Sequence, residues 1–315
     1  MKFAIMIDSS QQTYTKDKRA YLMGIAMIGV VLFHIAQHQE YTNPVSRMLL
    51  YVFGNGYLGV DIFFLLSAYG LCYSYNNNSL KRFYWNRFIR IIPAYPLALI
   101  IGYVEAGTHW KQACYEFVQQ ITGIAIFNGT LDILWYMEAL IILYVFFPIF
   151  YKLCQRIHSL GIGAILIICV IVHVSLIYIS DYWLQITVNR VPAMIVGVLT
   201  YIYDRENNKQ ALILLYGSLA LMSIMPLLSG MFLYLPAVLL LIVQVKRYIF
   251  KKALTFVGKH SLEIFIGHHF AFWIFNYSSW GYYVNLLLAL ILTAVFALII
   301  YYLQRGFKAL MSGCL

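Results

Sequence analysis

Charged side chains are scarce in this sequence. Asp, Glu, Lys and Arg make up only 11% of the 315 residues, 62% of the residues are hydrophobic, and the mean hydropathy is +0.76. Soluble domains carry about 25% charged residues. Few polar stretches are long enough to form a separate domain. The composition therefore excludes a soluble core and predicts a single transmembrane domain over residues 1–315.

A cysteine framework and a cleavable signal peptide are also missing. The five cysteines show no metal-ligand spacing, and only Cys114 falls in a predicted external loop. We therefore expect neither a disulfide framework nor a metal site. Residues 1–19 contain no apolar core followed by a small-residue cleavage site, so we expect the first apolar run to stay in the protein as a helix.

Long apolar segments are abundant instead. A transmembrane helix needs about 20 mostly apolar residues to cross the hydrocarbon of a bilayer. The segment around 115–127 is too short and too polar to cross, and we interpret it as a lid or interfacial helix. The sequence predicts an all-α membrane helix bundle of about ten spans, near residues 20–37, 56–75, 88–104, 132–151, 162–179, 190–203, 211–228, 231–245, 256–275 and 284–304.

The basic residues indicate how these spans are oriented. Placing the N-terminus in the cytoplasm puts all but three of the 22 Lys and Arg residues on the cytoplasmic side, the exceptions being Arg47, Lys111 and Arg190. The positive-inside rule predicts this asymmetry, so we expect both termini in the cytoplasm. The net charge of +10 then lies in short loops between apolar helices, and we expect no nucleic acid partner.

Ionisable residues inside the predicted spans are candidates for function, because a charge in a span is costly. At about 1.5 Å rise per residue, His34, Asp61 and Glu138 lie roughly 9 Å below the outer face, and His268 about 12 Å. Four groups from four helices thus share one layer. Histidine accepts a proton near neutral pH and a carboxylate can orient it, which is what general-base catalysis needs.

Other interpretations of this layer remain open. A buried histidine in a helix bundle can simply complete a hydrogen bond, and Asp61 can cap or pair with a neighbouring helix. A proton-coupled transporter also places acids and histidines in the middle of the membrane, although it predicts an internal repeat that the sequence does not show.

A basic segment precedes the third predicted span. Arg82, Arg87 and Arg90 lie close together in the sequence, and the spacing of three puts Arg87 and Arg90 on one face of a helix. Two guanidiniums near a helix N-terminus make a good phosphate clamp. The alternative is that these residues only anchor the protein to anionic membrane lipid.

Several motifs occur in the order found in a known family. Residues 56–70, GYLGVDIFFLLSAYG, contain Ser67 and resemble a "GxxGVxxFFxLSGf" signature. Arg87-x-x-Arg90-x-x-Pro93 resembles an RxxRIxP segment, and the first span ends in VVLFH at His34. Similar matches are Trp135-Tyr-Met-Glu138, the segment from Arg190 to Gly197, and the segment from Phe256 to His268.

The ordered set resembles acyltransferase family 3, bacterial integral membrane O-acyltransferases that act on carbohydrates. The resemblance implies a multi-pass enzyme of the bacterial cytoplasmic membrane that moves acetyl from acetyl-CoA to a hydroxyl of a surface polysaccharide or glycan precursor. It implies that His34 is the catalytic base, with Glu138 and Asp61 in the catalytic site. Expected donor-binding residues are Arg87, Arg90, Arg82 and Arg19, and expected acceptor-binding residues are Trp135, Arg190, His268 and Ser67.

The chain departs from the family pattern at two positions. The family often has an arginine eleven residues before the catalytic histidine, where this chain has Met23, with Lys18 and Arg19 one turn nearer the cytoplasm. Ala68 replaces the usual glycine after Ser67. The residues leave open direct transfer or an acyl-histidine relay. Further alternatives are a glycan or small-molecule exporter, another membrane acyltransferase with a different fold, and a catalytically altered family member.

Overall fold

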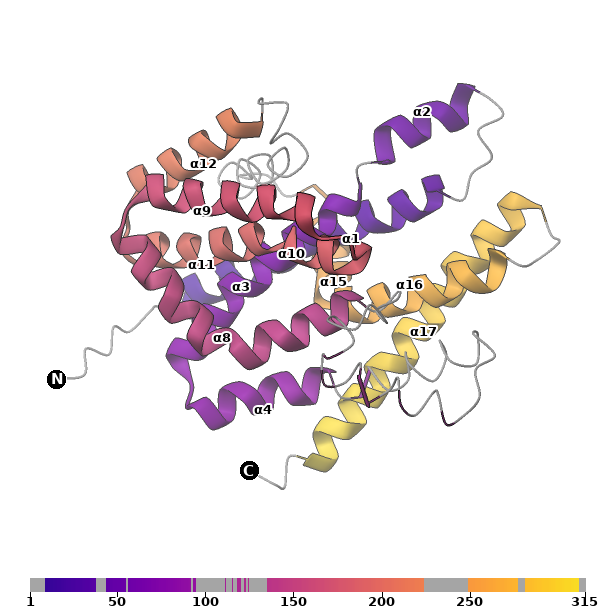
Figure 1. Cartoon of the computed structure of the whole chain (residues 1–315). Coiled ribbons are helices and arrows are strands. Elements are labelled where there is room, and N and C mark those ends of the chain that lie inside the picture. Colours follow the sequence, from indigo (N-terminus) through magenta and orange to yellow (C-terminus); the bar gives the residue numbers. More distant parts are fainter. Residues whose placement is uncertain are drawn as a thin grey trace.

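The computed structural model describes residues 9–37, 44–54, 56–91, 93–94, 135–223, 249–276 and 281–311, with a few positions between 111 and 124. Within these ranges every regular element is helical and no strand occurs (Figure 1). The α-helices are α1 (Ser9–Gln37), α2 (Pro44–Phe53), α3 (Gly59–Asn77), α4 (Leu80–Ile91), α8 (Trp135–Ser159), α9 (Ile162–Ser175), α10 (Tyr182–Val188), α11 (Val191–Arg205), α12 (Lys209–Ser223), α15 (Lys251–Lys259), α16 (Ser261–Asn276) and α17 (Tyr282–Met311). Two 3₁₀ turns, Gly56–Leu58 and Leu176–Tyr178, precede α3 and follow α9.

Five helical segments are long and apolar enough to cross a membrane, and they begin at Lys18, Leu50, Trp135, Leu184 and Tyr283. The prediction of a polytopic, all-helical membrane protein is therefore confirmed. The count of about ten spans and the cytoplasmic termini stay predictions. Residues 231–245 and most of 88–104 lie outside the described residues, as does most of the predicted lid at 115–127.

The predicted span 256–275 is divided in the structure. Helix α15 ends at Lys259, His260 leaves helical geometry with φ −107° and ψ 19°, and α16 begins at Ser261. The three lysines of α15 are exposed, whereas most described side chains of α16 are buried. The single predicted span is therefore a short polar helix followed by an apolar helix. The chain leaves helical geometry at His260, where the polarity of the sequence changes.

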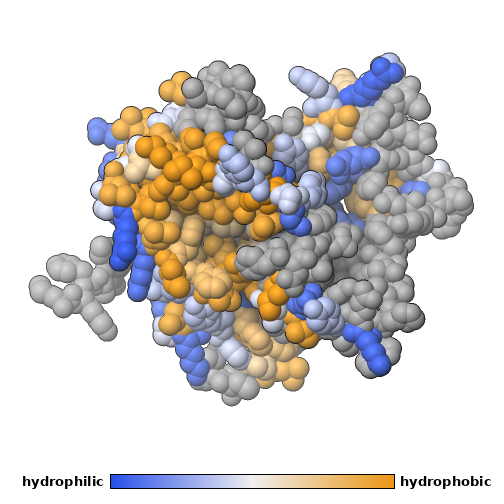
Figure 2. Space-filling view, viewed as in Figure 1, coloured by the Kyte–Doolittle hydropathy of each residue, from blue (hydrophilic) through white to orange (hydrophobic). Residues whose placement is uncertain are grey.

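Apolar side chains cover much of the outer surface. Exposed residues include Ile167 and Ile171 on α9, Phe146 and Ile149 on α8, and many positions along α17. Figure 2 shows a broad apolar area on the side where α8 and α9 lie. A surface of this kind is stable against lipid tails and would be unusually large for a soluble monomer.

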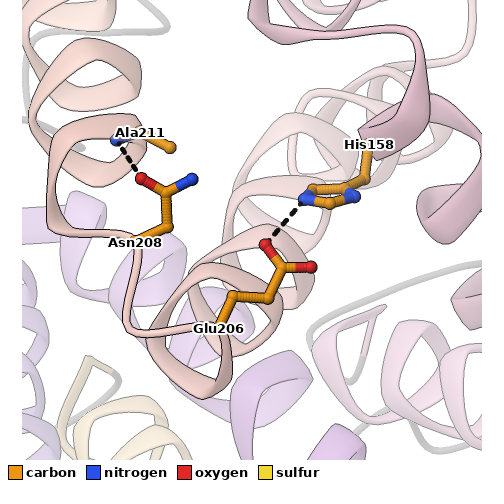
Figure 3. A network of polar contacts seen from close by, with 4 residues as sticks. All are labelled: His158, Glu206, Asn208 and Ala211. Atoms are coloured by element: carbon orange, nitrogen blue, oxygen red, sulfur yellow. Dashed lines mark hydrogen bonds and ion pairs between the residues drawn. The ribbon is translucent and has the colours of Figure 1, made fainter.

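The C-terminal ends of α8 and α11 lie together. His158 Nε2 lies 3.2 Å from Glu206 Oε2, and the nearby Asn208 side chain accepts a hydrogen bond from the amide of Ala211 at the start of α12 (Figure 3). Predicted spans four and six were both expected to run from outside to inside, so their inner ends should share one side. The contact agrees with that part of the predicted topology.

Helix α1 lies between α3 and α15 in direct backbone contact with both. A methyl group placed on Gly258 would overlap the carbonyl oxygen of Ala20, and one on Gly24 would overlap that of Leu254. On the other side of α1, a methyl group on Gly59 would overlap the carbonyl oxygen of Ala26. Glycines allow this close approach, which is a common way for helices to pack in membranes. The position of α1 is therefore sensitive to any added atom at these contacts.

We expect Gly258→Ala to force α15 away from α1 and to lower stability by about 1–3 kcal/mol, the usual cost of overpacking. Thermal unfolding of the detergent-purified protein measures this as a lower midpoint. Gly163→Ala on α9 is the matched control, because nothing lies within 4 Å of its added methyl group. Equal midpoints for the two variants would contradict the close contact.

Candidate functional site

A cavity of about 190 Å³ lies among α1, α3, α4, α8 and α16. Its wall combines guanidinium groups, tyrosine and serine hydroxyls, and apolar side chains. The lining residues are Arg19, Met23, Phe63, Ser67, Gly70, Leu71, Tyr73, Ser74, Arg87, Arg90, Tyr136, Leu140, Tyr144, Ser261, Leu262 and Phe265. We call it the basic cavity.

Three arginines converge on the basic cavity without a carboxylate to balance them. Arg87 and Arg90 project from one face of α4 as their spacing predicts, but they lie in its C-terminal half and not near a helix N-terminus as expected. Arg19 reaches the cavity from α1. In the described part of the chain, no ion pair joins any of the three to an acid. Burial lowers the pKa of Arg87, and the neighbouring Arg90 lowers it further. Such uncompensated positive charge favours binding of an anion.

Neighbouring groups hold two of the three guanidiniums, those of Arg19 and Arg87, in place. Arg19 donates from Nε to the carbonyl oxygen of Leu66 at 2.9 Å, and its guanidinium lies against Gly70. Arg87 lies over the rings of Phe83 and Tyr144, at 5.5 and 5.7 Å from their centroids. These cation–π contacts hold the group in place and leave its N–H donors available.

The structure separates the predicted donor-binding residues into two groups. Arg19, Arg87 and Arg90 come together, whereas Arg82 is exposed and does not line the basic cavity. Met23, where the family often has arginine, lines the same cavity as Arg19. Arg19, one turn away, thus brings a guanidinium to the cavity that Met23 cannot supply.

Farther along α1, His34 forms a cluster with two histidines of α16, His268 and His269. The ring centroids of His34 and His268 are 5.2 Å apart, and one nitrogen from each of His34, His268 and His269 lies within 4.8 Å of the others. His268 is fully buried and His34 is half-buried. The depth argument therefore brought His34 and His268 together correctly. It missed His269, whose only sequence signal is its place next to His268.

Asp61 and Arg190 form a buried ion pair instead of lying apart. Arg190 donates from Nη1 to Asp61 Oδ2 at 2.7 Å, and the Arg190 guanidinium lies 6.0 Å from the ring of Trp135. The open interpretation of Asp61 as a partner for a neighbouring helix is the one that the structure supports. Arg190, counted as external from the sequence, is almost fully buried.

Glu138 and Ser67 complete the predicted set. Glu138 is fully buried in the first turn of α8, where a carboxylate is favoured by the helix dipole. Ser67 is buried and faces the basic cavity, so the structure places it with the arginines and not with the acceptor-binding residues expected beside it.

A series of aromatic ring contacts leads from the wall of the basic cavity to the histidines. Phe63, Tyr136 and Phe265 line the cavity, with centroids of successive rings 6.2 and 4.6 Å apart. The Phe265 ring also contacts the ring of His268 at 5.4 Å. One side chain therefore touches both the cavity and the histidine cluster. We call Phe63, Tyr136 and Phe265 the aromatic layer; nothing in the sequence singled it out among 27 Tyr and 21 Phe.

We expect either single variant, Asp61→Leu or Arg190→Met, to lower stability by about 3–5 kcal/mol, because each leaves one buried charge unpaired. The double variant should regain most of that loss. Thermal unfolding in detergent tests this directly. A double variant as unstable as the sum of the two singles would show that the pair does not hold α3 and α11 together.

Comparisons with known proteins identify the family of this chain. The family model described as an acyltransferase domain, that of acyltransferase family 3, matches residues 21–305. The acyltransferase MdmB of Streptomyces mycarofaciens is 28% identical over 154 residues, which cover 43% of this chain and 39% of that relative. No solved structure matches. Because the family model spans α3, α4, α8 and α16 together with His34, the chain belongs to acyltransferase family 3.

Proposed function

We propose that this protein is an O-acyltransferase that moves acetyl from acetyl-CoA to a hydroxyl of a cell-surface polysaccharide or glycan precursor. The observation that carries the proposal is the position of the basic cavity, one aromatic side chain away from a histidine cluster. The family and the printed name of the relative support acyl transfer. Donor, acceptor and the catalytic role of His34 are proposed from the chemistry of the residues.

The basic cavity suits the donor. CoA carries several phosphate charges, and Arg19, Arg87 and Arg90 supply three guanidiniums to a cavity whose described lining contains no acid. The cavity is smaller than the ~300–1,000 Å³ of typical small-molecule pockets. It therefore fits the narrow thioester arm better than the whole cofactor, with the phosphates held on its arginine side. The acyl end then points toward Phe265 and the histidines.

His34 suits the role of general base. Its ring is half-buried, so an acceptor hydroxyl can reach it, and an imidazole accepts a proton near neutral pH. In the proposed reaction His34 takes the hydroxyl proton while the oxygen attacks the thioester carbonyl. The C–S bond then breaks, and the proton passes from His34 to the departing CoA sulfur.

The acceptor side is assigned to Trp135, Arg190 and Glu138. The Arg190 guanidinium lies over the Trp135 indole. Glu138 is buried in the same first turn of α8 as Trp135. An aromatic face with a few fixed polar groups is typical of small-molecule sites. We place the protein in the bacterial cytoplasmic membrane with both termini in the cytoplasm, so that acetyl-CoA reaches the arginines from inside.

We expect His34→Ala to lower kcat for acetyl transfer by about 10²–10⁴-fold, the usual contribution of a general base. The variant should still insert and elute as one species by size-exclusion chromatography. Labelled acetyl-CoA and surface glycan from a deletion strain serve as donor and acceptor. Full transfer activity in the folded His34→Ala protein would rule out the proposed base.

Gly70→Ala should raise KM for acetyl-CoA with little change in kcat, because the new methyl carbon would lie 2.9 Å from Cζ of Arg19 and displace it. Arg87→Ala should have the same effect, and each lost charge-assisted contact is worth about 1.5–3 kcal/mol, or roughly 10–100-fold in KM. Initial rates against donor concentration measure this. Arg82→Ala is the control, since Arg82 lies outside the cavity; an equal effect there would contradict the assignment.

A further inference from the structure

We propose that His268 is the positioning partner of His34, with its Nε2 accepting a hydrogen bond from the His34 ring directly or through one water. The inference rests on the proposed function, because it deepens the role of the same site. A histidine would then do the orienting that sequence reasoning assigned to a carboxylate.

The hydrogen bonding of His268 defines its tautomer. Its Nδ1 lies 3.1 Å from the backbone carbonyl oxygen of Ile264, one turn earlier on α16. A carbonyl oxygen can only accept, so Nδ1 carries the hydrogen. A neutral imidazole has one N–H, and Nε2 is therefore left with a lone pair and acts as an acceptor.

That acceptor has no partner among the described residues. His268 is fully buried, and its Nε2 receives no hydrogen bond from any of them. A buried acceptor without a donor is costly and rare, so a functional reason is expected where one persists. The rings of Phe265 and Phe272 contact His268 but offer no polar donor.

His34 is positioned to supply the donor. Its ring centroid lies 5.2 Å from that of His268, with the ring planes 46° apart, and one nitrogen of each ring lies within 4.8 Å of one nitrogen of the other. This separation is short enough for a bond through one water, or for a direct bond after a small ring rotation. If one nitrogen of His34 donates to His268, the other nitrogen keeps the lone pair that removes the hydroxyl proton.

Asp61, an acid that the sequence placed at a similar depth, is already engaged in another interaction. Its Oδ2 accepts from Arg190 at 2.7 Å in a separate ion pair on α3 and α11. His268 replaces a carboxylate in the way that the acid of a catalytic triad orients its histidine. A neutral acceptor fixes the tautomer of His34 without adding a buried negative charge to the membrane layer.

Three variants at one position test this role. The carboxamide of Gln places an oxygen where Nε2 of histidine stands, and that of Asn reaches only the Nδ1 position. We expect His268→Leu and His268→Asn to lower kcat by about 10²–10⁴-fold, with KM for acetyl-CoA changed less than about threefold. His268→Gln should recover at least about tenfold of the lost kcat. Loss of kcat in all three variants alike would overturn the acceptor role.

Two controls separate this inference from the proposed function. The double variant His34→Ala/His268→Leu should be no slower than His34→Ala alone, because residues acting as a unit are not additive. Activity in the His34→Ala protein would contradict the proposed function. Loss of activity in His34→Ala together with full activity in His268→Leu would contradict only this inference. His260→Gln, near the start of the same helix beside Tyr301, should keep normal rates.

The same cluster of three nitrogens could instead hold a metal ion, and the test includes that outcome. Purified protein is assayed after treatment with EDTA and again after addition of Zn²⁺. Unchanged kcat in EDTA supports the hydrogen-bonded pair. Loss of activity in EDTA that Zn²⁺ restores would overturn it in favour of a histidine-bound metal.

Discussion

The contact of α1 with the backbones of α15 and α3 fixes the helix that joins the basic cavity to the histidine cluster. Gly24, Gly258 and Gly59 let these helices touch with no side chain between them. Helix α1 carries Arg19 into the basic cavity and, fifteen residues later, His34 into the histidine cluster. At about 1.5 Å per residue, the two are separated by roughly 22 Å along one rigid rod. The basic cavity and the histidine cluster, the sites proposed for donor binding and catalysis, are thus held at a fixed spacing by the same helix.

Much of the site could be predicted because the membrane makes polar residues conspicuous. His34 and His268 stood out in apolar runs, and the helical rise alone placed them at similar depth. The spacing of Arg87 and Arg90 likewise predicted a shared face. What sequence could not supply was the direction of each side chain around its helix. That direction decides that Asp61 meets Arg190, that Ser67 faces the basic cavity, and that Arg82 turns outward.

In the fold, too, average hydropathy predicts the long apolar helices but misses breaks within them. Five of the predicted spans are matched by long apolar helices. The predicted span 256–275 covered two helices, because a window of that length does not detect a single residue, His260, leaving helical geometry. Met23, at a position where the family often has arginine, left open whether α1 carries a guanidinium to this site. The packing of Arg19 against Gly70 shows that a guanidinium still reaches the cavity from α1.

The aromatic layer of Phe63, Tyr136 and Phe265 has a consequence for proton movement between the basic cavity and the histidine cluster. Arginines near one end of α1 and a histidine near its other end are polar groups that a proton wire could connect. Phe265, whose ring lines the basic cavity and contacts His268, offers no hydrogen-bond donor or acceptor through which a proton could pass. Polar groups on both sides of Phe265 therefore lie in one protein without a proton path through that side chain.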